Sequence, residues 1–112
     1  GQAGDRITFD SRSGPLVVTR RADGALELDF PATPPHEEHD AALRAGVSAA
    51  IGGATVTWLG RSRFDLLAVL PDAAAVRAVK PDMPRIAALG GRGLIVTAAG
   101  VEGTDFVSRF FA

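Results

Sequence analysis

Arginine and serine side chains that could bind an anion occur together in the stretch Arg61-Ser62-Arg63. It lies between two apolar segments with the composition of β-strands, a position from which loops often contact ligands. Two guanidinium groups could hold a carboxylate there through paired hydrogen bonds. Two solvated arginines at a β-turn are the more common outcome of this pattern. Arg61, Ser62 and Arg63 are therefore candidate substrate contacts, with solvent exposure as the alternative.

Ser108 and Arg109, close to the last residue of the sequence, raise the same two possibilities. Successive side chains of a strand point to opposite faces, so the direction of Arg109 depends on which face of the last strand is buried. We keep both residues as candidate substrate contacts.

Acid–base catalysis needs a carboxylate in a defined position, and no carboxylate in the sequence can be assigned to it. Asp29, Asp65 and Asp105 each lie at the end of a predicted strand, where capping and solvation account for them. We predict no catalytic residue in this chain.

The two histidines, His36 and His39, lie three residues apart. Together with the neighbouring acidic residues Glu37, Glu38 and Asp40 they form a candidate metal site. They follow a proline-rich break in which nothing would hold four ligands in place. We therefore expect solvated side chains and no metal site.

Neither a phosphate-binding loop nor a serine nucleophile is indicated by the sequence. The glycine-rich stretch 90–93 lacks the Lys-Ser/Thr ending of a phosphate-binding loop and precedes a strand instead of a helix. None of the five serines lies in a Gly-x-Ser-x-Gly elbow, and neither histidine has the context of a catalytic triad. Hydrolysis by a serine nucleophile is not supported.

Composition narrows the class of protein. The 112 residues suffice for one small domain, and 46% hydrophobic against 22% charged residues argues for a packed fold. The net charge of -1 gives no field that would attract nucleic acid or anionic lipid. No apolar run reaches the roughly 18 to 20 residues of a membrane helix. The absence of cysteine fits a reducing compartment. We predict a cytoplasmic protein with neither nucleic acid nor membrane as a partner.

The elements that position these residues follow from hydrophobic periodicity and from turn formers. The first thirty residues predict a three-stranded meander, with turns at Ser11–Pro15 and Asp23-Gly24. Pro31–Pro35 then breaks regular structure, and the polar residues that follow read as a linker.

The remainder predicts helices alternating with pairs of strands. Asp40 is the expected N-cap of a helix that ends at Gly52-Gly53, and prolines 81 and 84 should interrupt the helical stretch that starts at Pro71. The predicted strands are 54–60, 64–70, 94–98 and 104–111, and the predicted helical stretches after the first are 71–79 and 85–89. The fold class is α+β, with more sheet than helix.

Five stretches together resemble the PhzF-like phenazine biosynthesis proteins. They are, in order, "TFDSRSGPLVV" (8–18), "LELDFPATPP" (26–35), "LGRSRFDLLAVLPD" (59–72), "GLIVTA" (93–98) and "DFVSRFFA" (105–112). Their common order and spacing extend the resemblance over nearly the whole chain.

The resemblance implies a diaminopimelate epimerase-like fold, in which two lobes each wrap a sheet around a central helix and the active site lies between them. Residues 1–30 would be the last strands of the first lobe, 31–39 the proline-rich crossover and 40–112 the first part of the second lobe. Such proteins are cofactor-independent isomerases of small molecules in phenazine-type or related secondary metabolism, and a glutamate serves as their acid and base.

The sequence also departs from that family. The catalytic glutamate, the Gly-His-Ala-Thr helix start and the Asp-Pro-Val-Thr-Gly-Ser-Ala-His stretch of the family are not found in it. We therefore expect the isolated chain to be inactive, and exposed strand edges to favour a homodimer or other self-association. The Arg61–Arg63 turn and Ser108-Arg109 resemble positions near the substrate.

Two alternatives stay open. The chain could be a non-enzymatic binding or self-associating module. It could also belong to an amino-acid epimerase or racemase of the same fold that uses a pair of cysteines. The "SRSGPL" and "SRFFA" stretches favour the PhzF-like interpretation.

Overall fold

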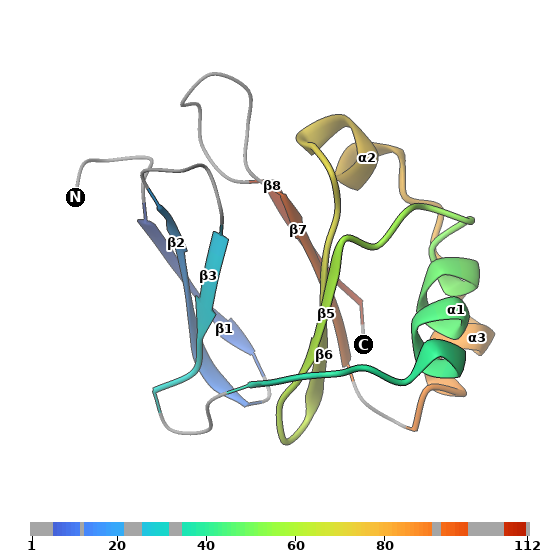
Figure 1. Cartoon of the computed structure of the whole chain (residues 1–112), viewed down its shortest axis with the longest axis horizontal. Coiled ribbons are helices and arrows are strands. Elements are labelled where there is room, and N and C mark those ends of the chain that lie inside the picture. The colour runs from blue at the N-terminus through green and yellow to red at the C-terminus, as the bar shows by residue number, and fades with distance from the viewer. Residues whose placement is uncertain are drawn as a thin grey trace.

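Two β-sheets and a layer of helices lie face to face in the computed structural model (Figure 1). The structure describes residues 6–11, 13–21, 26–31, 35–90, 93–98 and 107–111. A three-stranded sheet covers one face of a five-stranded sheet, and the helices cover the other face (Figure 1). This arrangement confirms the α+β class.

The three-stranded sheet is the predicted meander. Its strands β1 (Arg6–Ser11), β2 (Gly14–Arg20) and β3 (Leu26–Asp29) pair antiparallel in the order β1-β2-β3. Ser11 pairs with Gly14, so the first turn is tighter than expected, and Gly14 has a positive φ of 103° that suits a residue without Cβ. The expected Asp23-Gly24 turn lies outside the described residues.

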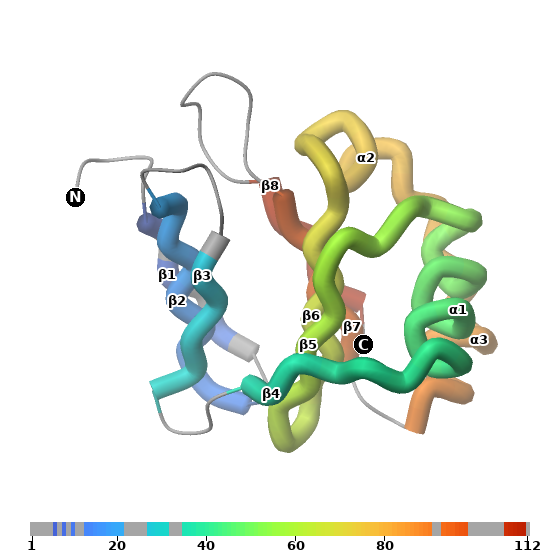
Figure 2. The backbone as a smooth tube through the Cα atoms, viewed as in Figure 1, coloured from blue at the N-terminus to red at the C-terminus, as the bar shows by residue number. Residues whose placement is uncertain are grey.

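The polar stretch after the prolines is more ordered than a linker. His36 and Glu37 form a short strand, β4, which pairs antiparallel with β5 (Trp58–Arg61). The amide of Glu38 extends the pairing by donating to the carbonyl of Leu59 at 2.9 Å. Figure 2 shows this part of the chain running from the side of the first sheet to the first helix. The stretch still connects the two sheets, and within it β4 satisfies backbone groups that would otherwise form the edge of β5.

The five-stranded sheet is mixed, with the order β4-β5-β6-β7-β8. β6 (Asp65–Val69) and β7 (Gly93–Ala98) run parallel, whereas the other neighbours run antiparallel, including β8 (Val107–Phe111) on β7. Every residue of β7 is buried, as expected for a strand covered on both faces. Residues 54–57 were predicted to belong to β5, but they precede the sheet.

Helix α1 (Ala41–Ala50) begins where the sequence predicted. The Asp40 carboxylate caps it by accepting from the amides of Ala42 at 2.8 Å and Leu43 at 3.2 Å. Gly52 and Gly53, with φ of 82° and 85°, follow its end.

Helices α2 (Ala73–Ala78) and α3 (Met83–Ala87) lie on the crossover between the parallel strands. Asp72 caps α2 by accepting from the amide of Ala75 at 2.8 Å. The predicted interruption lies between Ala78 and Met83, and Pro84 itself lies in the first turn of α3, where its missing N–H needs no partner. No helix in the described ranges has the length and apolarity needed to cross a membrane.

Alternation along the central strands divides the core in two. On β6 and β7, Leu66, Ala68, Leu94 and Val96 point to the helices. Leu67 and Ile95 point the other way and pack against the first sheet, with these fully buried partners: Leu16, Val18 and Phe30. We call this second cluster the inter-sheet core. It fixes how the first sheet sits on the second.

Candidate functional site

The tips of two hairpins touch at one edge of the inter-sheet core. The β1–β2 tip brings Ser13, and the β5–β6 tip brings Ser62, Phe64 and Asp65. We call these four residues the hairpin junction. In Figure 1 it lies at the lower end of the two sheets.

Hydrogen bonds connect the hairpin junction across the two sheets. The backbone N–H of Ser13 donates to Oδ2 of Asp65 at 3.0 Å, and the amide of Phe64 donates to Oγ of Ser13 at 3.0 Å. The two serine hydroxyls lie 2.6 Å apart, and Oγ of Ser62 lies 3.3 Å from the carbonyl oxygen of Asp65. All four contacts are satisfied when Ser13 donates to Ser62 and Ser62 donates to that carbonyl.

The residues that make these hydrogen bonds are buried, where an unpaired polar group would be costly. Ser13 and Ser62 are each 6% exposed, and Asp65 is 0% exposed. The solvation expected for Asp65 at a strand end was wrong, because the first sheet covers that end of β6. Its Oδ1 atom has no hydrogen-bond partner among the described residues.

Gly93 packs tightly against that oxygen. A Cβ atom on Gly93 would lie 2.8 Å from Oδ1 of Asp65 and 2.6 Å from Cε1 of Phe110. Real Cβ atoms do not approach so closely, so glycine is the residue that fits here. The amide of Gly93 donates to the carbonyl of Phe64 at 3.0 Å, which joins β7 to the junction.

Arg61 and Arg63 lie at the surface beside the junction, whereas Ser62 between them turns inward. Nε of Arg61 is 3.6 Å from a carboxylate oxygen of Glu38. The guanidinium carbon of Arg63 is 5.0 Å from the centre of the Phe64 ring, and this ring is 43% exposed. The predicted trio is therefore divided into two surface cations and one buried hydroxyl.

Ser108 and Arg109 point to opposite faces of β8. Oγ of Ser108 lies 2.8 Å from Oγ1 of the buried Thr97. Thr97 is four residues along β7 from Gly93, or about 13 Å at about 3.3 Å per residue. The structure thus does not bring Ser108 together with Ser62.

Arg109 is engaged with a helix. Its Nη1 donates to the carbonyls of Val79 at 2.9 Å and Val76 at 3.3 Å, at the C-terminal end of α2. A cation in this position interacts favourably with the carbonyls at the end of a helix, and the Val76 carbonyl also accepts the amide of Val79 at 3.3 Å. The guanidinium carbon also lies 5.0 Å from the centre of the Phe111 ring.

The side chains of both histidines are exposed, although His36 pairs with Arg61 beside the junction. His36 is exposed on β4, and Nε2 of His39 is 4.0 Å from a carboxylate oxygen of Glu37, with the His39 side chain 80% exposed. Within the ranges that the structure describes, no three side chains of the metal-binding types are grouped to hold an ion. Asp105 and residues 91–92 of the glycine-rich stretch lie outside those ranges.

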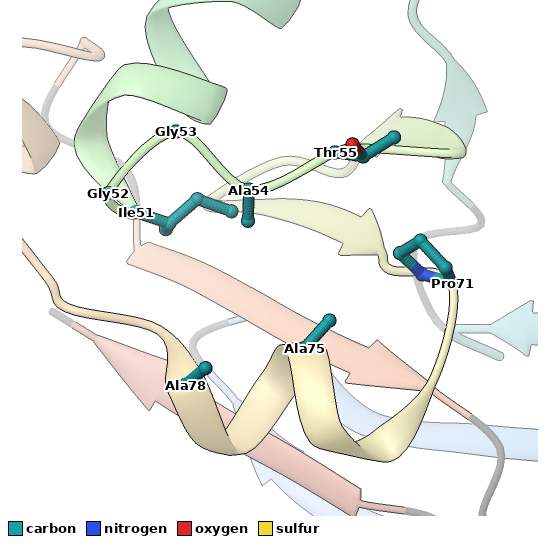
Figure 3. A pocket seen from close by; sticks show the side chains of 8 residues that line it. All are labelled: Ile51, Gly52, Gly53, Ala54, Thr55, Pro71, Ala75 and Ala78. Carbon is teal, nitrogen blue, oxygen red and sulfur yellow. The ribbon is translucent and has the colours of Figure 1, made fainter.

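A cavity of about 300 Å³ opens on the helix side, between the end of α1 and helix α2 (Figure 3). Small residues dominate its lining: Ile51, Gly52, Gly53, Ala54, Thr55, Pro71, Ala75 and Ala78. Pro71 follows the C-terminal end of β6, whereas Asp65 begins that strand. The cavity and the hairpin junction therefore belong to opposite ends of the sheet.

Sequence reasoning missed the roles of Ser13 and Asp65. A signal for Asp65 was present, because this carboxylate lies in an otherwise apolar stretch of the predicted strand 64–70. Nothing local distinguished Ser13, whose partners are about fifty residues away in the chain.

Comparison with known proteins agrees with the resemblance of the sequence. No protein-family model matches the chain. A Pseudomonas aeruginosa protein named as an uncharacterized isomerase is 46% identical over 111 residues, which are 99% of this chain and 40% of that protein. The crystal structure of a PhzF-family phenazine biosynthesis protein from Enterococcus faecalis matches 99% of this chain with a TM-score of 0.60 and 37% identity. Over nearly its whole length the chain resembles part of the PhzF-family phenazine biosynthesis proteins.

A second solved structure supports the same assignment. A protein from Clostridium difficile, described as a putative phenazine biosynthesis PhzC/PhzF protein, matches 96% of the PhzF-like chain with a TM-score of 0.59 and 33% identity. The chain spans about 40% of the length of these relatives, since it covers 40% of the Enterococcus protein and 39% of the Clostridium protein.

Proposed function

We propose that this PhzF-like chain forms part of an isomerase that moves a proton on a small molecule by general acid–base catalysis. The observation that carries the proposal is the 46% identity, over almost all of the chain, to a protein named as an isomerase. Phenazine-type or related secondary metabolism is the proposed setting, because both solved relatives are described as phenazine biosynthesis proteins. A cytoplasmic location belongs to the same proposal, and the lack of cysteine is compatible with it.

In this proposal the chain contributes to two lobes. Residues 1–30 would belong to the first lobe, 31–39 to the crossover and 40–112 to the second lobe. The division is supported by the two separate sheets, β1–β3 and β4–β8. The hairpin junction would then hold the two lobes together where their sheets meet.

Arg61 and Arg63 are the proposed substrate contacts, because their cationic side chains are exposed at the tip of the β5–β6 hairpin. Ser62 would support that tip from within. Ser108 and Arg109 would support β8 and not contact the same substrate, since their polar groups bond to Thr97 and to helix α2. No catalytic group is assigned to this chain, and we propose that it is inactive by itself.

Self-association is a second candidate role. β8 is the last strand in the order of the five-stranded sheet, and its Phe110 is 42% exposed. Such an edge can pair with a second copy by strand addition. Light scattering of the purified chain tests this, and a monomer at all concentrations would contradict it.

A chimera tests the proposed isomerase function. The chain replaces the matching 111 residues of the Pseudomonas relative. Parent and chimera are then incubated in D₂O with dihydro-hydroxyanthranilate, the substrate that the resemblance to the PhzF-like proteins implies, and deuterium incorporation at carbon is followed by NMR. We expect both to incorporate deuterium and the isolated chain to incorporate none.

Each contrary result has a distinct meaning. An active parent with a folded but inactive chimera would refute the proposal that the chain fills the role of its relative. Incorporation by the isolated chain would refute its inactivity. Failure of the parent as well would refute this substrate.

A further inference from the structure

β8 carries backbone groups that face away from the sheet. It is the last strand in the order of the five-stranded sheet, and β7 is its neighbour there. On β7, the amide of Gly93 donates to the carbonyl of Phe64, just before β6, at 3.0 Å. The carbonyl of Thr97 accepts from the amide of Leu70, just after β6, at 2.9 Å. Gly93 and Thr97 therefore direct these backbone groups to the β6 side.

Ser108 and Phe110 hold the outward groups of β8. Successive residues of a strand direct their N–H and C=O groups to opposite sides. Since Gly93 and Thr97 face β6, the even-numbered residues of β7 face β8, where the register places them opposite residues 107, 109 and 111. The N–H and C=O groups of Ser108 and Phe110 thus point away from β7, and in the described part of the chain no backbone hydrogen bond reaches them. Such an edge can recruit another strand.

Aromatic rings lie on both faces of this edge. The Phe110 ring packs over Gly93, with Cε1 2.6 Å from the place that a Cβ atom of Gly93 would take, and Phe110 is still 42% exposed. It lies opposite Ile95 of the inter-sheet core, so it belongs to the face that the first sheet covers. On the other face, the guanidinium carbon of Arg109 is 5.0 Å from the centre of the Phe111 ring, which packs against the helix-side core.

We propose that β8 of a second copy of this chain pairs antiparallel with this edge, about a two-fold axis at Phe110. The inference rests on the self-association proposed above and gives it a register. In this pairing the amide of each Phe110 donates to the carbonyl of the other. The two exposed rings lie opposite each other, and aromatic pairs across strands stabilise a sheet. The two-fold axis makes the contact self-complementary, so that it closes at two copies.

Charge decides between this register and its neighbour. A two-fold axis at Arg109 would pair Ser108 with Phe110 of the second copy, but it would also place two guanidinium groups opposite each other, and like charges directly opposite destabilise a sheet. With the axis at Phe110, each Arg109 lies opposite Phe111 of the second copy, on the face turned to the helices. A cation and an aromatic ring attract each other there.

Single cysteines test the register, because the chain has none of its own. At the proposed axis, residue 110 lies opposite itself at about 5.5 Å between Cα atoms, which a disulfide can bridge. Residue 108 is displaced by four positions from its copy, about 14 Å at about 3.4 Å per residue, which is too far. Under mild oxidation Phe110→Cys should become a covalent dimer, whereas the matched control Ser108→Cys, on the same edge, should not.

Proline and leucine at the same position test the backbone contact. Phe110→Pro removes the outward N–H group and leaves the bonds of β8 to β7 in place, because that group does not point to β7. Phe110→Leu keeps the N–H group and loses only the ring. In light scattering, the mass of the original chain and of Phe110→Leu should rise with concentration from 11.6 kDa towards twice that value, and Phe110→Pro should stay at the lower mass.

The contrary results separate the claims. A monomeric original chain would refute both the self-association and this pairing. Equal crosslinking of the two cysteine variants would refute the register, and association of Phe110→Pro as strong as that of the original chain would refute the backbone contact. The cysteine pair gives an answer even if the proline variant does not fold. No outcome depends on turnover, so the proposed isomerase function stands or falls separately by the chimera.

Discussion

Replacing Ser13 with alanine tests whether the hairpin junction holds the two sheets together. The change removes the hydroxyl that accepts from the amide of Phe64 at 3.0 Å and contacts Oγ of Ser62 at 2.6 Å. It leaves the backbone bond from residue 13 to Asp65 in place. Each such bond contributes about 1 kcal/mol, and a buried polar group left unpaired costs about 1–3 kcal/mol. Ser13→Ala should therefore lower the free energy of unfolding by about 2 kcal/mol.

Urea unfolding of Ser13→Ala, Ser62→Ala and the double variant measures this effect and its origin. Because the two hydroxyls share one contact, the double variant should lose less than the sum of the single losses, by about 0.5–1.5 kcal/mol. Ser108→Ala combined with Ser13→Ala is the control pair, since Ser108 bonds to Thr97 at the other end of the sheet, and its losses should add. A Ser13→Ala loss below about 0.5 kcal/mol, or additive losses for Ser13 and Ser62, would refute the reasoning.

Three further substitutions test the core and the helix ends. Phe30→Ala empties a fully buried place in the inter-sheet core, so it should cost about 3–5 kcal/mol in urea unfolding, and a cost below about 1 would show that the sheets do not pack there. Arg109→Met keeps the apolar stem but loses both carbonyl contacts, so amide exchange in α2 should accelerate while α1 stays protected. Asp40→Ala should cost about 1 kcal/mol through the lost cap of α1, whereas Asp40→Asn should cost little.

Much of the architecture could be predicted because its causes are local. The cap of α1 depends on the Asp40 carboxylate, which accepts hydrogen bonds from amides only two and three residues further along the chain. The first meander depends on neighbouring strands joined by turns, and a strand with alternating polarity shows which of its faces is buried.

The sequence by itself determined the α+β class, the cap of α1 and the resemblance to the PhzF-like proteins, because these depend on residue type and short spacing. Only the tertiary structure decided that Asp65 is buried, that Ser62 turns inward to Ser13 and that Arg109 binds α2. Those outcomes depend on which sheet covers which face, and on contacts between residues about thirty to fifty positions apart. The local sequence carries no sign of such contacts, because the burial of a residue depends on which distant part of the chain packs over it.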